Sequence, residues 1–198
     1  MRSALSCALL FGVAGTGCAA PPTASSAAAL PAPAASTTQS EAERYLPLLN
    51  DTVFSYSAWL PESAEPEQLI LQVNRPSPQH ANLRSGSLVK RLELVADGVR
   101  LITGGYLLKA PLVAGADWAG PAGRVRITAV DQDVRVAAGQ FAGCLTTLES
   151  DTQGPAPRSI ETTYCPGVGI VRFSVDDGER QERFELKSFG PRVDVNAL

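Results

Sequence analysis

The stretch from Ala138 to Ser174 constrains the fold of this chain more than any other. Two of its segments, Phe141–Ser150 and Ser159–Cys165, are rich in threonine, leucine, isoleucine, tyrosine and phenylalanine, which suit β-strands. The sequence DTQGPAPR between them holds the turn formers aspartate, glycine and proline. The stretch therefore predicts an antiparallel hairpin with a long loop, followed by a return into a third strand.

The two cysteines of this hairpin suggest its register. If Ser150 pairs with Ser159, then Cys144 lies opposite Cys165, because both pairs of residue numbers have the same sum. Non-hydrogen-bonded partners in an antiparallel pair have Cα atoms about 4.5 Å apart, a separation that a disulfide accepts. Two buried free thiols, packed as small apolar groups, are the alternative. Since an even pair of cysteines suits an oxidising compartment, we expect a Cys144–Cys165 disulfide.

The rest of the folding part of the chain also alternates as antiparallel strands do. Asp97-Gly98 is a strong signal for a tight hairpin turn. In Glu179–Ser188 the apolar residues share one face and the charged residues the other, as in antiparallel sheets with one solvated face. The expected strands are Thr52–Trp59, Leu69–Val73, Leu88–Val95, Val99–Thr103, Tyr106–Leu108, Val125–Val130, Val134–Val136, Phe141–Ser150, Ser159–Cys165, Val168–Val175 and Glu179–Ser188. We expect an all-β antiparallel meander of about ten strands, forming a strongly curved sheet or an open barrel.

Two segments between the expected strands are predicted to be loops. Asn74–Gly86 is polar, has two prolines and holds the only histidine, His80. Pro111–Gly123 holds Trp118, which we expect to cover one end of the core rather than to serve as a ligand platform. A short helix is expected before the first strand, with Ser40 as its N-cap.

The N-terminal part of the chain predicts export. Residues 1–17 have one basic residue, Arg2, then an apolar run and small residues, as in a secretory signal peptide. Gly17-Cys18 resembles the end of a lipobox, which predicts lipidation of Cys18; the alternative is that Cys18 is a small apolar residue in the cleavage region. Residues 18–40 are almost entirely alanine, proline, serine and threonine, which predicts a disordered tether. Residues 41–198 then form the single β domain.

Lipidation of Cys18 would fix the place of the protein in the cell. Lipid chains there would hold the chain at a membrane. Ala19 follows the cysteine instead of the aspartate that retains many lipoproteins in the inner membrane. We therefore expect a lipid-anchored protein of the bacterial cell envelope, in the outer membrane rather than the inner.

Four short motifs resemble those of a family of uncharacterised bacterial lipoproteins of the myxobacterial type. They are Tyr45-Leu46-Pro47-Leu48, the Gly-x-x-Trp of Gly115 to Trp118, the AGxF turn of Ala138 to Phe141 followed by Cys144, and the Y-x-PGVG-[IL]-V signature of Tyr164 to Val171. The resemblance spans nearly all of the chain after residue 44. It implies a lipid-anchored β domain and carries no assigned chemistry.

The residue types that carry common enzyme chemistry are scarce. The sequence has a single histidine, His80, and no GxSxG-like turn that would carry a nucleophilic serine for it to activate. It also has no cluster of cysteines and histidines suited to zinc. A turn is expected at Asp131-Gln132, between the strands Val125–Val130 and Val134–Val136. Asp131 and Asp133, close to this turn, could hold a cation, but turn chemistry explains them better. Acidic and basic residues are mixed, and the formal charge is −3, so nothing indicates nucleic-acid binding. We expect no enzymatic activity, no metal site and no cofactor.

Two functions fit these features. The first is a non-enzymatic envelope lipoprotein whose β domain binds a protein or another envelope component. The second is a carrier that holds an apolar ligand, such as an acyl chain or lipid, in a half-barrel cavity. Aromatic residues on both faces of Thr52–Trp59 mildly favour the carrier.

Overall fold

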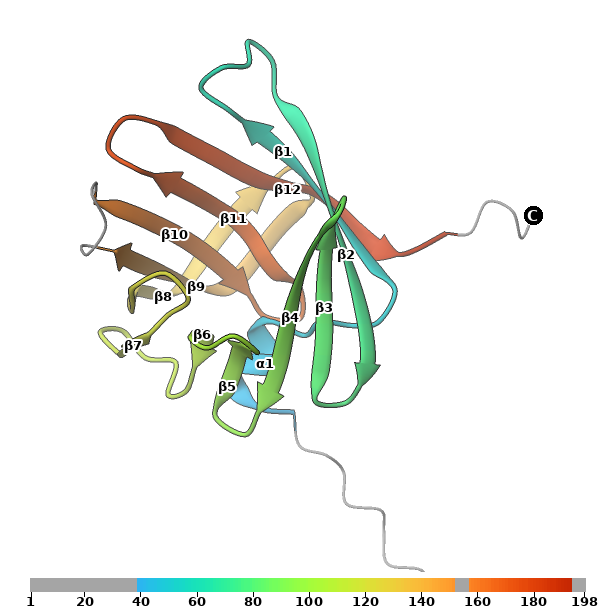
Figure 1. Cartoon of the computed structure of the whole chain (residues 1–198), viewed down its shortest axis with the longest axis vertical. Coiled ribbons are helices and arrows are strands. Elements are labelled where there is room, and N and C mark those ends of the chain that lie inside the picture. Colours follow the sequence, from blue (N-terminus) through green and yellow to red (C-terminus); the bar gives the residue numbers. More distant parts are fainter. Residues whose placement is uncertain (1–38, 152–156, 194–198) are drawn as a thin grey trace, which may run out of the picture. The chain divides into compact units, whose positions relative to one another are not determined.

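A single antiparallel sheet forms most of the computed structural model of the protein, which describes residues 39–151 and 157–193 (Figure 1). The predicted signal peptide and residues 18–38 of the predicted tether lie outside the described residues. The elements are α1 (Glu41–Tyr45), β1 (Thr52–Trp59), β2 (Glu67–Ser77), β3 (His80–Ser85), β4 (Leu88–Val95), β5 (Gly98–Leu101), β6 (Tyr106–Lys109), β7 (Asp117–Ala119), β8 (Arg124–Val136), β9 (Gly139–Asp151), β10 (Arg158–Cys165), β11 (Gly169–Asp176) and β12 (Gln181–Pro191).

The topology is a meander with one long-range pairing. The strand order is β6-β5-β4-β3-β2-β1-β12-β11-β10-β9-β8-β7. Consecutive strands therefore pair, except β6 and β7, which are the two edges, and β1 also pairs with β12. The prediction of an all-β antiparallel meander is confirmed, with twelve strands in the described part of the chain. Figure 1 shows the sheet curving strongly along its length.

The two loops predicted from the sequence contain strands. The prediction for Asn74–Gly86 is wrong because β2 extends to Ser77 and β3 follows at His80. The pairing of β2 with β3 is irregular between Asn74 and Ser77, and an irregularity is where a strand tolerates proline. The prediction for Pro111–Gly123 is wrong at its centre, where β7 pairs with the start of β8.

The turn predicted at Asp131-Gln132 is also wrong, because β8 continues through it from Arg124 to Val136. Its pairing with β9 shifts at several points between Ile127 and Val134, and Asp131 has a φ of 54°. Aspartate tolerates this left-handed conformation better than most residues, and an extra residue in one strand bends it. The residues that suggested a reversal therefore bend one long strand.

The two edge strands, β6 and β7, meet and nearly close the sheet into a barrel. The indole Nε1 of Trp118 donates a hydrogen bond of 3.0 Å to the carbonyl oxygen of Tyr106. Gly105 has a φ of 82°, and a Cβ there would come within 2.5 Å of the backbone of Gly120. Trp118 is 6% exposed, so it is a core residue at this seam, as its expected covering role requires.

Aromatic side chains pack against one another inside the sheet. The rings of Phe173 and Phe184 stack with centroids 4.2 Å apart, and Tyr56 meets Phe173 edge to face at 5.8 Å. The Tyr56 hydroxyl donates to the carbonyl oxygen of Ile170 at 2.8 Å. Burial raises the pKa of Tyr56 and of Tyr164 above the ordinary tyrosine range, so both phenols stay neutral inside the core.

Helix α1 lies beside the bend in β9. Ser40 is its N-cap, as predicted, and accepts a hydrogen bond from the Glu43 amide at 3.1 Å. A half-buried ion pair of 2.7 Å joins Glu43 to Arg75 of β2. The Tyr45 hydroxyl donates to the carbonyl oxygen of Gly143 at 3.0 Å, so the helix contacts β9 where the strand changes direction.

Candidate functional site

The hairpin of β9 and β10 forms one wall of the candidate site. Its pairing places Ser150 opposite Ser159 and Leu145 opposite Tyr164, which is the register predicted from the cysteines. Cys144 and Cys165 form the predicted disulfide, with Cα atoms 4.2 Å apart and both side chains fully buried. The expectation of a disulfide is therefore confirmed.

Beyond the disulfide, the end of the β8–β9 hairpin bends towards β12. We call residues 129–143 the β8–β9 arm. Gly143, at its base, has a φ of 67°. At its tip the Ala138 amide donates to the carbonyl oxygen of Leu186 in β12 at 3.1 Å, and the rings of Phe141 and Phe189 lie 6.3 Å apart. These contacts bring the arm across from β9 to β12.

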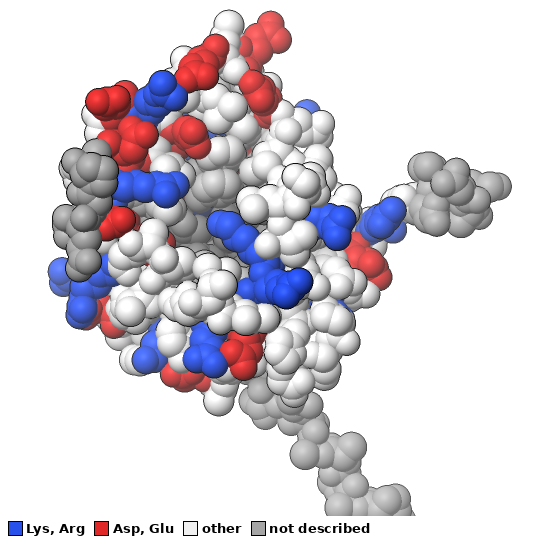
Figure 2. Space-filling model, viewed as in Figure 1, with Lys and Arg blue, Asp and Glu red and all other residues white. Residues whose placement is uncertain are grey.

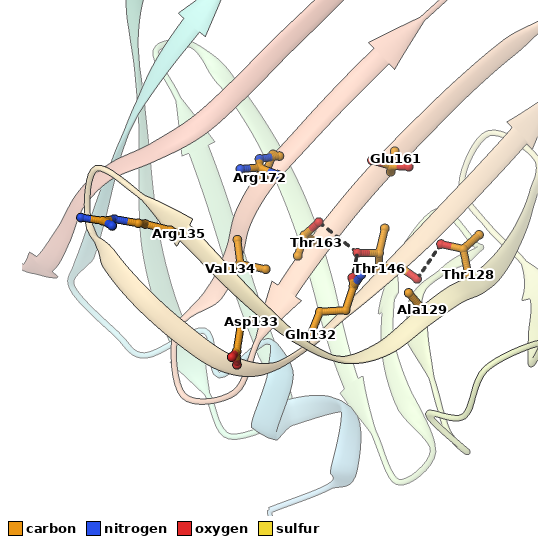
Figure 3. Close-up of a pocket in the computed structure, with 10 residues that line it drawn as sticks. All are labelled: Thr128, Ala129, Gln132, Asp133, Val134, Arg135, Thr146, Glu161, Thr163 and Arg172. Atoms are coloured by element: carbon orange, nitrogen blue, oxygen red, sulfur yellow. Dashed lines mark hydrogen bonds between the residues drawn. The ribbon is translucent and has the colours of Figure 1, made fainter.

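A pocket of about 490 Å³ lies between the β8–β9 arm and the outer face of β9, β10 and β11 (Figure 3). We call it the arm pocket. Its floor is on the outer face because the inward-facing Tyr164 and Leu145 alternate with the floor residues Thr163 and Thr146. The lining residues are Thr128, Ala129, Gln132, Asp133, Val134, Arg135, Thr146, Glu161, Thr163 and Arg172.

A short chain of polar side chains crosses the floor. The Thr146 hydroxyl donates to Gln132 Oε1 at 2.8 Å and lies 3.1 Å from the Thr163 hydroxyl. The Thr128 hydroxyl donates to the Thr146 carbonyl oxygen at 3.2 Å. Figure 3 shows these residues side by side at the centre of the pocket, joined across β8, β9 and β10. Thr146 and Thr163 are buried, so the hydroxyl pair is fixed in place.

Charged groups of both signs surround this floor. The lining holds two arginines, Arg135 and Arg172, and two carboxylates, Asp133 and Glu161, so its formal charge is 2 − 2 = 0. Arg172 Nε lies 3.1 Å from a carboxylate oxygen of Glu185, but its buried N–H has no hydrogen-bond partner among the described residues. The other three charged groups form no ion pair with described residues. A polar ligand could therefore contact charged side chains that are not already paired.

The residues singled out from the sequence lie in different places. Cys18 lies outside the described residues. His80 is exposed in β3, with Nδ1 3.0 Å from the Ser77 hydroxyl. Asp131 and Asp133 are both exposed on the β8–β9 arm, and only Asp133 lines the arm pocket. Within residues 39–151 and 157–193, no cluster of three or more metal-binding side chains is present.

Sequence reasoning missed the threonines and the glutamine of the pocket floor. A signal for the two threonines was available. The residue numbers of Thr146 and Thr163 have the same sum as those of Cys144 and Cys165, so the predicted register places these threonines opposite each other. Gln132 gave no such signal, since it reaches the floor only through the bend of β8. Among the described residues, no helix is long and apolar enough to cross a membrane.

Comparison with known proteins finds neither a matching family model nor a matching curated protein. Two solved structures are similar. One is a candidate exported protein with a YmcC-like fold from Bacteroides fragilis, 10% identical, covering 72% of this chain and 96% of that one, with a TM-score of 0.48. The other is a candidate lipoprotein from Parabacteroides distasonis, 12% identical, with the same two coverages and a TM-score of 0.44.

Proposed function

We propose that this chain is a non-enzymatic, lipid-anchored protein of the bacterial cell envelope whose β domain binds a polar envelope component in the arm pocket. The observation that carries the proposal is the pocket itself, about 490 Å³ in volume and lined mainly by hydroxyl, amide and charged side chains. Ligand sites in proteins have volumes of this order. The lipobox-like Gly17-Cys18 and the Cys144–Cys165 disulfide support export to an oxidising compartment.

The anchor is tested by Cys18→Ser in the full chain. We expect the variant to incorporate no labelled fatty acid and to move from the membrane pellet to the soluble extract, because the serine hydroxyl cannot form the thioether to the lipid. The wild-type chain should fractionate with the outer membrane. Cys7→Ser, within the predicted signal peptide, is the matched control and should leave both properties unchanged. Equal label in the wild type and Cys18→Ser would show that Cys18 is not the anchor.

The same unanchored variant tests binding. We expect Cys18→Ser chain to co-sediment with washed envelope fragments, and Gln132→Ala to reduce the sedimented fraction because Gln132 lies on the pocket floor. Gln72→Ala is the matched control, since Gln72 lines a second polar pocket of about 410 Å³ on other strands. Sedimentation no greater than that of an unrelated protein would contradict the proposed function.

A second candidate function, carriage of an apolar ligand, is favoured by one observation. The inner faces of β2, β3 and β4 carry leucines that are only partly buried towards the β3–β4 turn, and one of them, Leu88, is 60% exposed. These residues are Leu69, Leu71, Leu83 and Leu88. The exposed Lys90 of β4 lies opposite Leu83 of β3 in the strand pairing, so both side chains are on the same face. Figure 2 shows basic side chains over β3 and β4 beside a hollow.

An acyl chain with an anionic head group would suit this end of the sheet. Native mass spectrometry of the full Cys18→Ser chain, gently purified from the soluble extract, tests the carrier function. A stoichiometric lipid that is lost in Leu83→Asp is the expected result for a carrier. A chain of its bare sequence mass in every preparation would contradict it.

A further inference from the structure

We infer that the arm pocket takes a neutral, polyhydroxylated ligand, a saccharide, which its floor recognises through side chains. The inference rests on the proposed function and names the ligand class of the same site. It depends on the charge balance of the lining, on the hydrogen-bonding groups of the floor, and on the pairing of the strands beneath.

The charge balance of the lining argues for a neutral ligand. The lining holds Arg135 and Arg172 together with Asp133 and Glu161, and Arg172 also forms an ion pair with Glu185 of β12. A charged ligand of either sign would therefore meet like charges as well as opposite ones. A neutral ligand with many hydroxyl groups can donate to the carboxylates and accept from the guanidinium groups at the same time.

The floor provides both donors and acceptors. Gln132 Oε1 accepts from Thr146, which leaves the Gln132 amide nitrogen, with two N–H donors, without a partner among the described residues. The Thr163 hydroxyl has Thr146 as its one side-chain partner there and can still make a further hydrogen bond. The Arg172 Nε–H lies beside the Glu185 carboxylate but is a buried donor that makes no hydrogen bond to the part of the chain that the structure describes. Adjacent hydroxyl groups of a sugar ring match such closely spaced donors and acceptors.

The pairing of the floor strands argues against an extended peptide that adds to them. A peptide that adds to a sheet needs a strand edge with unpaired backbone groups. The floor strand β10 pairs with β9 on one side and β11 on the other, and β9 also pairs with β8. On the floor, recognition therefore falls to side chains.

The lining also argues against an acyl chain. Only Ala129 and Val134 of its ten residues are apolar. Burying hydrocarbon against unpaired carboxylate, guanidinium and amide groups would remove water from them without replacing their hydrogen bonds, which is unfavourable. A saccharide replaces those hydrogen bonds with its own.

Isothermal titration of the full Cys18→Ser chain tests the ligand class with named probes. The neutral probes are maltotriose, cellotriose and triacetylchitotriose; the charged ones are trigalacturonate and chitotriose with free amines. We expect at least one neutral trisaccharide to bind more tightly than either charged one. Gln132→Ala and Thr163→Val should each weaken that binding about 3- to 10-fold, the effect of one hydrogen bond.

Matched controls separate the pocket from the fold. Gln72→Ala removes the same group from the second polar pocket, and Thr162→Val changes the neighbouring threonine, which faces the interior. Both should leave the saccharide affinity unchanged. Gln132 is exposed on the β8–β9 arm, so Gln132→Ala should unfold at the wild-type temperature and its binding loss can be read directly.

Each other outcome overturns the inference. Tighter binding of a charged trisaccharide excludes the neutral class, and equal affinity in the wild type and Gln132→Ala excludes the arm pocket as the saccharide site. No binding by any probe also excludes the saccharide. In each of these cases, continued co-sedimentation with envelope fragments that Gln132→Ala weakens would keep the proposed function and remove only the ligand class.

Discussion

The double variant Cys144→Ala/Cys165→Ala is expected to have a free energy of unfolding about 3.4 kcal/mol below that of the oxidised wild type, by the chain-entropy estimate for a loop of this size. The two cysteines are 21 residues apart, and their bond removes conformations from the unfolded chain that the variant regains. Alanine is the suitable replacement because both side chains are fully buried, where a serine hydroxyl would need a partner. Such a loss is a large part of the stability of an ordinary domain, about 5–15 kcal/mol.

Guanidinium unfolding measures this difference. The wild type unfolded in excess reductant is the control, and its midpoint should fall to about that of the double variant. Thiol counting on denatured, unreduced Cys18→Ser chain without its signal peptide should find no free thiol. An unchanged unfolding midpoint on reduction would show that the disulfide does not stabilise the fold.

Trp118→Ala is expected to lower the free energy of unfolding by about 3–5 kcal/mol, the usual cost of removing a large buried aromatic ring. Trp118 is 6% exposed and lies where β7 approaches β6, so its loss leaves a cavity and opens the contact between the two edge strands. Trp118→Phe keeps an aromatic ring in the core and removes the hydrogen bond to the Tyr106 carbonyl oxygen. The lost hydrogen bond should lower the free energy of unfolding by about 1 kcal/mol, and the smaller ring should add a further loss.

The other tryptophan is the control. Trp59 lies on the outer face of β1, with the guanidinium of Arg183 4.5 Å from its ring centre. A contact of this kind outside the core stabilises by about 0.5–1 kcal/mol, so Trp59→Ala should be much the milder change. Thermal unfolding followed by circular dichroism compares the two. Equal losses would show that the β6–β7 contact does not stabilise the sheet as proposed.

The sequence allowed the hairpin of β9 and β10 to be predicted in detail. Its register followed from the equal sums of Cys144 with Cys165 and Ser150 with Ser159, and the structure has that pairing. The two faces of β12 were also predictable, since Phe184 and Leu186 are buried while their charged neighbours are not. Such features are local or depend on one pair of strands, and alternation alone determines them.

The strands that were mistaken for loops depend on partners that are not visible in their own residues. β3 holds only Ala81 and Leu83 as apolar inward residues, and β7 is three residues long, so neither has a clear alternating pattern. Each forms because an adjacent strand pairs with it. The β-propensity of a residue describes how well it packs against residues of adjacent strands, and the local sequence does not show which strands those are.

The candidate site was less predictable than the fold for a similar reason. Its floor comes from facing threonines that the predicted register already placed together, but the pocket exists only because β8 bends at Asp131 and brings Gln132 over that floor. The aspartate and glutamine were taken for a turn, since turns and bulges share the same residue types. Distinguishing the two requires knowing that β8 and β9 continue as one long pair beyond the irregularity.

The single long-range pairing of the meander also determines the order in which the sheet can assemble. β1 ends at Trp59, and its partner β12 does not begin until Gln181, so a chain that emerges from its N-terminus presents β1 with one unpaired edge until almost all of it has emerged. β1 to β6 and β7 to β12 can each form from neighbouring hairpins, which lie close in sequence and form early. Joining β1 to β12 is then the last and slowest pairing, and until it forms, two complementary strand edges on one chain are open to strands of other chains.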